Sequence, residues 1–309
     1  MRGFPFLLIF IIILCCSWGF NPHKKINETA VFLLPTDLAL FYKVHIQKIT
    51  EKATDADKRC YVDTSEGPRH YIDLDRYEDV DSIPIHWSKA KEKLTERKLL
   101  AQGIVPWQIY RTYQNLVEAF KSKNLSRIIQ LSADLGHYVA DAHVPLHTTS
   151  NYNGQYTNQI GIHALWETRI PEMYMNQYDL FIGPALYLHD PLQIAWTIVR
   201  QSNMLVDSVL TIEKQLSQSF KSNEIKSYIE RNNQLLQTYS DNYVEAFDKS
   251  LNGMVERRFK ASIYHVASFW HSAWVDAGQP KLTNLSTNME EENINFQNKK
   301  ILGREEWHE

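Results

Sequence analysis

Three histidines and an aspartate lie within the stretch "HYVADAHVPLH", which runs from His137 to His147. His137 and Asp141 are four residues apart, so on a helix their side chains point to the same side. His163 and Glu167, in "GIHALWE", repeat this spacing. An imidazole and a carboxylate on one helical face supply half of a zinc site. Two such pairs, with His147 just beyond a helix-ending proline, predict a centre for more than one metal ion.

Further candidate ligands lie upstream of this stretch. His70 and Asp57 occur in "RHYIDLD" and "DADKR", within a segment rich in Asp, Pro and Gly, and His23 lies near the N-terminus. Any one of these residues alone would more often pack or form a hydrogen bond than bind a metal, so the prediction depends on the joint pattern. His143 is only two residues from Asp141, and we expect it to point elsewhere as a supporting hydrogen-bonding residue.

Helix signals dominate the sequence that must position these residues, and strand signals are scarce. Apolar residues recur at spacings of three and four, and caps or prolines mark helix starts at Pro106, at Asn124 or Ser126, and at Asp190-Pro191. These signals predict helices over about 27–49 with a break at Pro35, 106–120, 126–144, 191–216, 224–251 and 254–275. Residues 53–87 read as a long irregular connection, which is unusual unless functional. We therefore expect an all-α fold with a single compact multi-helix domain.

The first 17 residues have the pattern of a secretory signal, with Arg2 followed by an apolar run from Phe4 to Cys16. The run is too short to span a bilayer, which needs about 20 apolar residues. Cleavage would leave a domain over 18–280 and a polar tail over 281–309, exported to the periplasm or secreted, with no stable membrane span. Of three cysteines only Cys60 would remain, so we expect no internal disulfide and a fold stabilised by bound metal.

Taken together, these motifs resemble the superfamily that joins bacterial zinc-dependent phospholipase C to the single-strand-specific zinc nucleases of fungi and plants. "WGFNPH" is similar to the family's mature start, and "ADKR" followed by "RHYID" is similar to its Asp and His segment. "HYVADAHVPLH" resembles its central His-x3-Asp-x5-His, and "GIHALWE" resembles its last His-x3-acid. The resemblance covers Trp18 to Glu167, and the later helices carry no motif.

The resemblance implies three zinc ions in a cleft of the helical domain. One ion would be bound by Asp57, His70, His137 and Asp141, with Asp55 and Asp63 as alternatives to Asp57. A second would be bound by His147, His163 and Glu167. The third would take the terminal amine and carbonyl of Trp18, His23 and the other oxygen of Asp141. A zinc-bound hydroxide would attack a phosphodiester, and Asp57 would be the catalytic residue that orients it or takes its proton.

The substrate class is open between the two branches of the superfamily. Glu167 matches the phospholipases, since the nucleases usually have Asp there, and the chain lacks the nucleases' disulfides. Tyr71 and Asp73, by contrast, follow His70 as the nucleases' base-stacking ring and base-binding carboxylate follow their histidine, which makes both candidate substrate-binding residues. The nucleases' arginine after the metal aspartate is missing, because Cys60 occupies its position and Arg59 lies one place early.

These observations favour an exported zinc-dependent hydrolase, a phospholipase C-like phosphodiesterase acting on a phospholipid head group. The formal net charge of −3 gives no electrostatic argument for binding nucleic acid. A single-strand-specific zinc nuclease is the first alternative. An inactive zinc-binding protein is the second, although such a protein would have no need of the whole ligand set.

Overall fold

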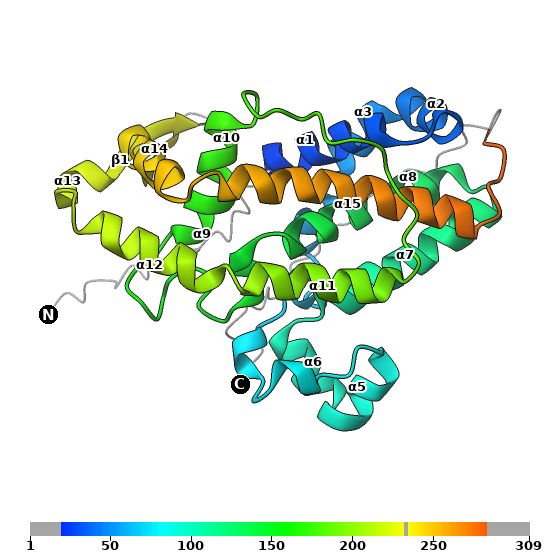
Figure 1. Cartoon of the computed structure of the whole chain (residues 1–309), viewed down its shortest axis with the longest axis horizontal. Helices are drawn as coiled ribbons and strands as arrows, with labels where there is room; N and C mark the ends of the chain where they lie inside the picture. Colours follow the sequence, from blue (N-terminus) through cyan, green and yellow to red (C-terminus); the bar gives the residue numbers. More distant parts are fainter. Residues whose placement is uncertain (1–19, 232–233, 283–309) are drawn as a thin grey trace, which may run out of the picture.

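The computed structural model describes residues 20–231 and 234–282, and within them the chain is built almost wholly of helices (Figure 1). The predicted all-α fold class is confirmed. The longer helices are α1 (Phe20–Ala30), α2 (Thr36–Val44), α5 (Trp87–Leu94), α7 (Val105–Lys121), α8 (Leu125–Ala142), α11 (Pro191–Asn203), α12 (Val206–Ser217), α14 (Asp241–Ser250) and α15 (Met254–Asp276). Shorter helices are α3 (Ile46–Lys52), α4 (Asp55–Arg59), α6 (Glu96–Gln102), α9 (Ile162–Ala164), α10 (Ile170–Tyr174) and α13 (Ser222–Ile225).

The predicted signal over 1–17 lies outside the described residues, and so does the predicted tail apart from residues 281–282. Among the helices that the structure does describe, none is both long enough and apolar enough to cross a membrane. The export signal and the domain boundaries therefore stay predictions.

Helix α8 lies at the centre of the fold and packs against α1, α3, α7, α11 and α15. Figure 1 shows α15 as a long helix that crosses the middle of the molecule to its right edge, with α11 below it. Leu135 and Trp270 are fully buried in the core between α8 and α15, and burying a side chain of this size stabilises a fold by about 1.5–3 kcal/mol. The indole of Trp270 also donates to Ser132 O on α8 at 2.9 Å.

Helix α1 approaches α8 very closely at Gly136. A Cβ at this position would lie 2.0 Å from the side-chain oxygen of Asn27, so a larger residue would have to displace this buried side chain. The amide of Asn27 donates to Ala133 O at 3.2 Å and fixes the same crossing. This contact places His23 of α1 beside His137 of α8, whose rings stack with centroids 4.2 Å apart.

Several predicted helix ends are confirmed by their capping contacts. Asn124, rather than Ser126, caps α8 and accepts from the backbone N–H of Arg127 at 3.1 Å. Asp190 caps α11 with Pro191 as the first helical residue. The long α15 begins directly after Gly253, whose φ of 72° suits glycine.

The helix predicted over 224–251 is wrong for its first half. An antiparallel hairpin, β1 (Lys226–Arg231) and β2 (Gln234–Tyr239), precedes α14, with Tyr228 opposite Gln237. The helix predicted over 191–216 is likewise two helices, since α11 ends at Asn203 and α12 begins at Val206.

The connection predicted over 53–87 is mostly irregular, as expected. Besides α4 it contains the short 3-10 turns η2 (Gly67–His70), η3 (Leu74–Arg76) and η4 (Val80–Ser82). The backbone N–H of Ile72 donates to His147 O at 2.9 Å, which ties the connection to η5 (Pro145–Thr148), the turn after α8. This long segment is therefore fixed against the end of α8.

The C-terminal end of α8 is held by a partly buried arginine from α15. Arg258 donates through Nε to His143 O at 2.9 Å and through Nη2 to Ser202 Oγ at 2.5 Å. Ser202 in turn donates to Ala142 O, a carbonyl of the last helical turn. A cation at this end also suits the helix dipole. Burial lowers the pKa of Arg258 to about 10, so the side chain remains charged near neutral pH.

We predict that Arg258→Met destabilises the protein by on the order of 2–3 kcal/mol, because the carbonyl of His143 and the hydroxyl of Ser202 lose their donor. Denaturant unfolding would measure the change. The neighbouring exposed Arg257→Met is the matched control, and we expect it to change the free energy of unfolding by less than about 0.5 kcal/mol. Equal stability of the two variants would show that Arg258 does not hold the end of α8.

Candidate metal centre

The first group of candidate ligands lies where α4, η2 and α8 meet. His137 Nε2 lies 3.4 Å from Asp57 Oδ1 and 3.0 Å from His70 Nδ1. One oxygen of Asp141, Oδ2, lies 2.9 Å from His70 Nδ1 and 3.3 Å from His137 Nε2. All four side chains are buried. Two imidazoles and two carboxylates thus converge on one point, and this buried group could hold a metal ion.

The second group comes from η5, the turn after α8, and from the next helical segment of the chain. His147 Nε2 and His163 Nε2 are 3.1 Å apart, and Glu167 Oε2 lies 3.3 Å and 2.6 Å from them, respectively. His163 belongs to α9, whereas Glu167 belongs to the π-helical turn η6 (Leu165–Arg169). A π-helical turn is rare and is frequent at functional sites. The i, i+4 pair still points to one place, although the backbone is wider there than in the predicted α-helix.

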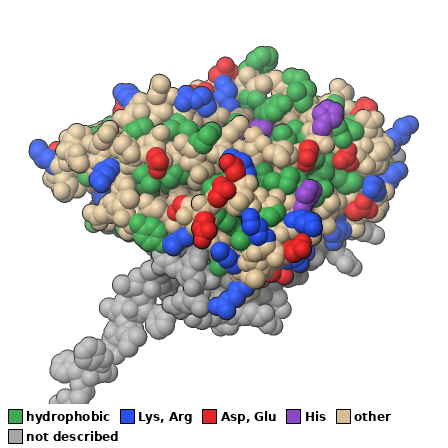
Figure 2. Space-filling view, turned by 60° about the horizontal axis from the view of Figure 1, so that its bottom comes forward, with side chains coloured by type: hydrophobic (Ala, Val, Ile, Leu, Met, Phe, Trp, Pro, Cys, Tyr) green, Lys and Arg blue, Asp and Glu red, His purple; other side chains and the backbone are tan. Residues whose placement is uncertain are grey.

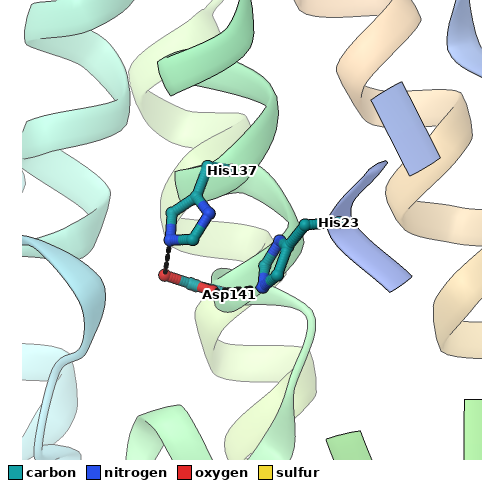
Figure 3. A group of neighbouring side chains, drawn as sticks. All are labelled: His23, His137 and Asp141. Carbon is teal, nitrogen blue, oxygen red and sulfur yellow. Dashed lines mark ion pairs between the residues drawn. The ribbon is translucent and has the colours of Figure 1, made fainter. Parts of the chain in front are cut away.

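His23 joins the two groups through the remaining carboxylate oxygens. Its Nε2 lies 3.4 Å from Asp141 Oδ1 and 3.3 Å from Glu167 Oε1. Figure 3 shows Asp141 between the rings of His23 and His137, with one oxygen directed at each. The sequence analysis predicted that Asp141 is shared in this way. It did not predict the contact of Glu167 with His23, because the spacing in the sequence assigns each acid only to the histidine on its own helix.

The tautomers of two histidines follow from their backbone contacts. His137 Nδ1 lies 2.9 Å from Ala53 O, and His147 Nδ1 lies 2.6 Å from His70 O. A carbonyl only accepts, so both Nδ1 atoms carry hydrogen, and in the neutral rings both Nε2 atoms present lone pairs to the cluster. Lone pairs that face one another and carboxylate oxygens need a cation between them. This donor set of imidazole nitrogens and carboxylates, each ring held by an acceptor, fits a zinc ion.

The charges of the groups show the same need for a cation. Burial would lower the pKa of His137, but the carboxylates of Asp141 and Asp57 raise this pKa well above its ordinary value. Burial would raise the pKa of Asp141, but His137 and His147 hold this pKa well below its ordinary value. Burial would likewise raise the pKa of Glu167, but His147 holds this pKa well below its ordinary value. The centre therefore favours ionised carboxylates together with positive charge, which protons or metal ions supply.

All eight side chains predicted as ligands are brought together by the structure, and they are His23, Asp57, His70, His137, Asp141, His147, His163 and Glu167. Of the three aspartates considered for the first group, Asp57 is the one that points inward. Asp55 instead pairs with Lys52 and Lys58, and Asp63 accepts from Ser65. Trp18 lies outside the described residues, so its role as a ligand stays a prediction.

Tyr71 and Asp73 are not presented to a substrate in this structure. Tyr71 is 4% exposed and Asp73 is 1% exposed. The hydroxyl of Tyr71 donates to Ala101 O at 3.4 Å, and its ring packs beside Gly103. Neither side chain therefore offers accessible surface to a substrate in this structure, and their role in substrate binding stays a prediction. Arg59 likewise points away from the centre, toward Glu66 and Asp134.

His143 lies outside the ligand groups, as predicted, and pairs with His265 of α15. His143 Nδ1 donates to Val139 O at 2.7 Å. His265 Nδ1 lies 2.9 Å from Ala261 O and 3.0 Å from His143 Nε2, so its one hydrogen is shared between these two acceptors. Burial lowers the pKa of His265 to about 4, and burial together with the nearby charge of Arg258 lowers the pKa of His143 well below its ordinary value. Both rings are therefore neutral near pH 7.

This pair predicts a loss of stability in acid. The pKa of His265 is about 4 in the folded protein against 6.5 as its ordinary value, so the unfolded chain binds the extra proton first as the pH falls from 6.5 to 4. The contribution is present above pH 6.5 and lost across that window. Denaturant unfolding of wild type and His265→Gln at several pH values should show a steeper decline for wild type. Parallel declines would contradict the assignment.

Comparison of the chain with protein-family models gave no match, and comparison with curated proteins gave none either. The site is therefore interpreted from its own residues. Around the eight candidate ligands, the structure adds supporting groups that the sequence analysis missed. Ala53 O accepts from His137, and His70 O accepts from His147. The buried Glu66 lies beside His70. Backbone carbonyls leave no trace in a sequence, so only Glu66 carried a residue type that could have been noticed.

Proposed function

We propose that the protein is a zinc-dependent phosphodiesterase of the phospholipase C type, with three zinc ions in the candidate metal centre. The observation that carries the proposal is the sharing of Asp141 and Glu167, each of which directs its two oxygens at different imidazoles. Such sharing suits adjacent cations, and clustered zinc ions are used to cleave phosphate esters. The predicted terminal amine of Trp18 would complete the third site beside His23.

Zinc bound here would polarise the phosphate oxygens, make a water acidic and stabilise the leaving oxygen. The chain's own residues orient these events. Asp57 touches both imidazoles of the first group, where it can align an attacking water and accept its proton. His163, with 22% of its side chain exposed, is the most accessible of the eight candidate ligands. The substrate would therefore approach from the side of His163.

Two observations support a phospholipid-like substrate over a nucleic acid. Tyr71 and Asp73, which alone suggested base recognition, are buried. On the face shown in Figure 2, Lys and Arg side chains alternate with Asp and Glu side chains and form no broad basic surface. Nucleic-acid binding depends strongly on such a surface. Glu167, in the position where the resemblance favours the phospholipases, agrees with this choice.

We predict about three zinc ions per chain in protein purified after export. Removal of zinc by a chelator should lower the melting temperature, because the buried carboxylates and imidazoles lose the cations between them and the one described cysteine, Cys60, forms no disulfide. Elemental analysis and thermal melts before and after chelation make both measurements. Fewer than two tightly bound zinc ions would overturn the metal centre.

We predict hydrolysis of a phosphocholine diester, with little cleavage of single-stranded DNA. Asp141→Asn should reduce the rate on the order of 100-fold or more, since metal-assisted charge stabilisation contributes several kcal/mol. His143→Ala is the matched control on the same helix end, and it should lose less than about tenfold because its ring faces His265. Circular dichroism would verify that both variants fold.

Equal losses in the two variants would show that Asp141 is not a ligand. Faster cleavage of the DNA than of the phosphocholine diester would favour the nuclease alternative. Zinc binding without either activity would leave an inactive zinc-binding protein.

A further inference from the structure

Glu66 is a fully buried carboxylate that is outside the proposed ligand set. It immediately precedes η2, and its side chain is 0% exposed. Arg69 Nη1 donates to its Oε2 at 2.5 Å, Arg59 donates to both of its oxygens at 3.4 Å, and the hydroxyl of Tyr138 donates to Oε1. A buried carboxylate is costly unless it is paired and hydrogen-bonded. Here two arginines and a phenol meet that requirement and keep it ionised.

The same carboxylate faces the far side of a proposed metal ligand. Oε1 of Glu66 lies 3.6 Å from His70 Nε2, and Cys60 Sγ lies 3.5 Å from the same nitrogen. The other ring nitrogen, Nδ1, points to Asp141 and His137. A neutral His70 that binds a metal through Nδ1 carries its hydrogen on Nε2. That hydrogen faces both Cys60 Sγ and the carboxylate of Glu66.

We infer that Glu66 is a positioning residue for His70, which it holds in the tautomer and orientation that direct Nδ1 at the metal centre. A carboxylate on the second nitrogen of a ligating imidazole fixes the ring and makes it a better donor. The inference rests on the proposed zinc centre and adds to it a residue that touches neither metal nor substrate.

A second acid, Asp134, belongs to the same hydrogen-bond network as Glu66. Arg59 lies between the two carboxylates and donates from Nη1 to Asp134 at 3.1 Å. Asp134 also accepts from Gln130 at 3.0 Å, and none of its contacts involves His70. The two acids thus share one arginine, but only Glu66 reaches the imidazole. Asp134→Asn is therefore a matched control that disturbs the same network without touching His70.

The test compares wild type, Glu66→Gln and Asp134→Asn as full-length, exported protein. Zinc affinity would be measured by competition with a chromophoric chelator. Cobalt-substituted protein would report ligand geometry through its visible absorption bands, and melting of the metal-free forms would report structural damage. We expect Glu66→Gln to weaken the affinity of one zinc by about 10–100-fold and to shift the cobalt bands. Asp134→Asn should leave both close to wild type, whereas the metal-free forms should melt at similar temperatures.

Zinc affinity and cobalt bands of Glu66→Gln equal to those of wild type would overturn the inference, as would equal losses in Asp134→Asn. If Glu66→Gln does not fold, Tyr138→Phe removes one donor from the carboxylate and should give a smaller loss of affinity in the same direction; no loss there would also overturn it. Failure of wild type itself to bind zinc would instead refute the proposed function.

Discussion

Buried lone pairs of imidazoles and carboxylates, all directed at one another, are the constraint on which the rest of this structure depends. Nε2 of His137 and Nε2 of His147 must present lone pairs when neutral, because the other nitrogen of each ring donates to a backbone carbonyl. Carboxylate oxygens of Asp141 and Glu167 face them within 3.3 Å. Without a cation, a low-dielectric interior would make this arrangement strongly repulsive. The fold therefore holds together a set of groups that is stable only with positive charge between them.

Such a set demands a rigid frame, and α8 supplies it. Four contacts fix the helix at separate points: its Asn124 cap, the close crossing of α1 at Gly136, Trp270 of α15 against Ser132, and Arg258 at its last turn. The irregular segment before α5 is bound to α8 by the side-chain contacts of Arg59 with Asp134 and of Glu66 with Tyr138. The backbone hydrogen bond from Ile72 to His147 O binds it to the turn after α8. The candidate ligands thus come from helices and from the turns between them, and packed helices set their distances from one another.

The sequence was sufficient to predict most of the side chains that converge in the candidate metal centre, and for physical reasons. His137 and Asp141 lie on a regular helix, where a spacing of four necessarily brings side chains to one face. Helix ends at Asn124, Asp190 and Gly253 were predictable because capping chemistry is local. The hairpin before α14 was missed because apolar periodicity over a short segment does not separate strand from helix. The π-helical turn at Glu167 and the approach of His23 to that carboxylate depend on tertiary packing, which no local spacing encodes.

The histidines outside the candidate metal centre show how the fold keeps its two kinds of imidazole distinct. His143 is two residues from Asp141, yet its surroundings are a carbonyl, His265 and the cation Arg258, and these favour a neutral ring. His137, six residues earlier, has two carboxylates instead, and these favour positive charge at its Nε2. The residue type is the same and the burial is the same. What differs is the sign of the neighbouring charges, and that sign decides which side of α8 attracts a cation and which side packs against α15.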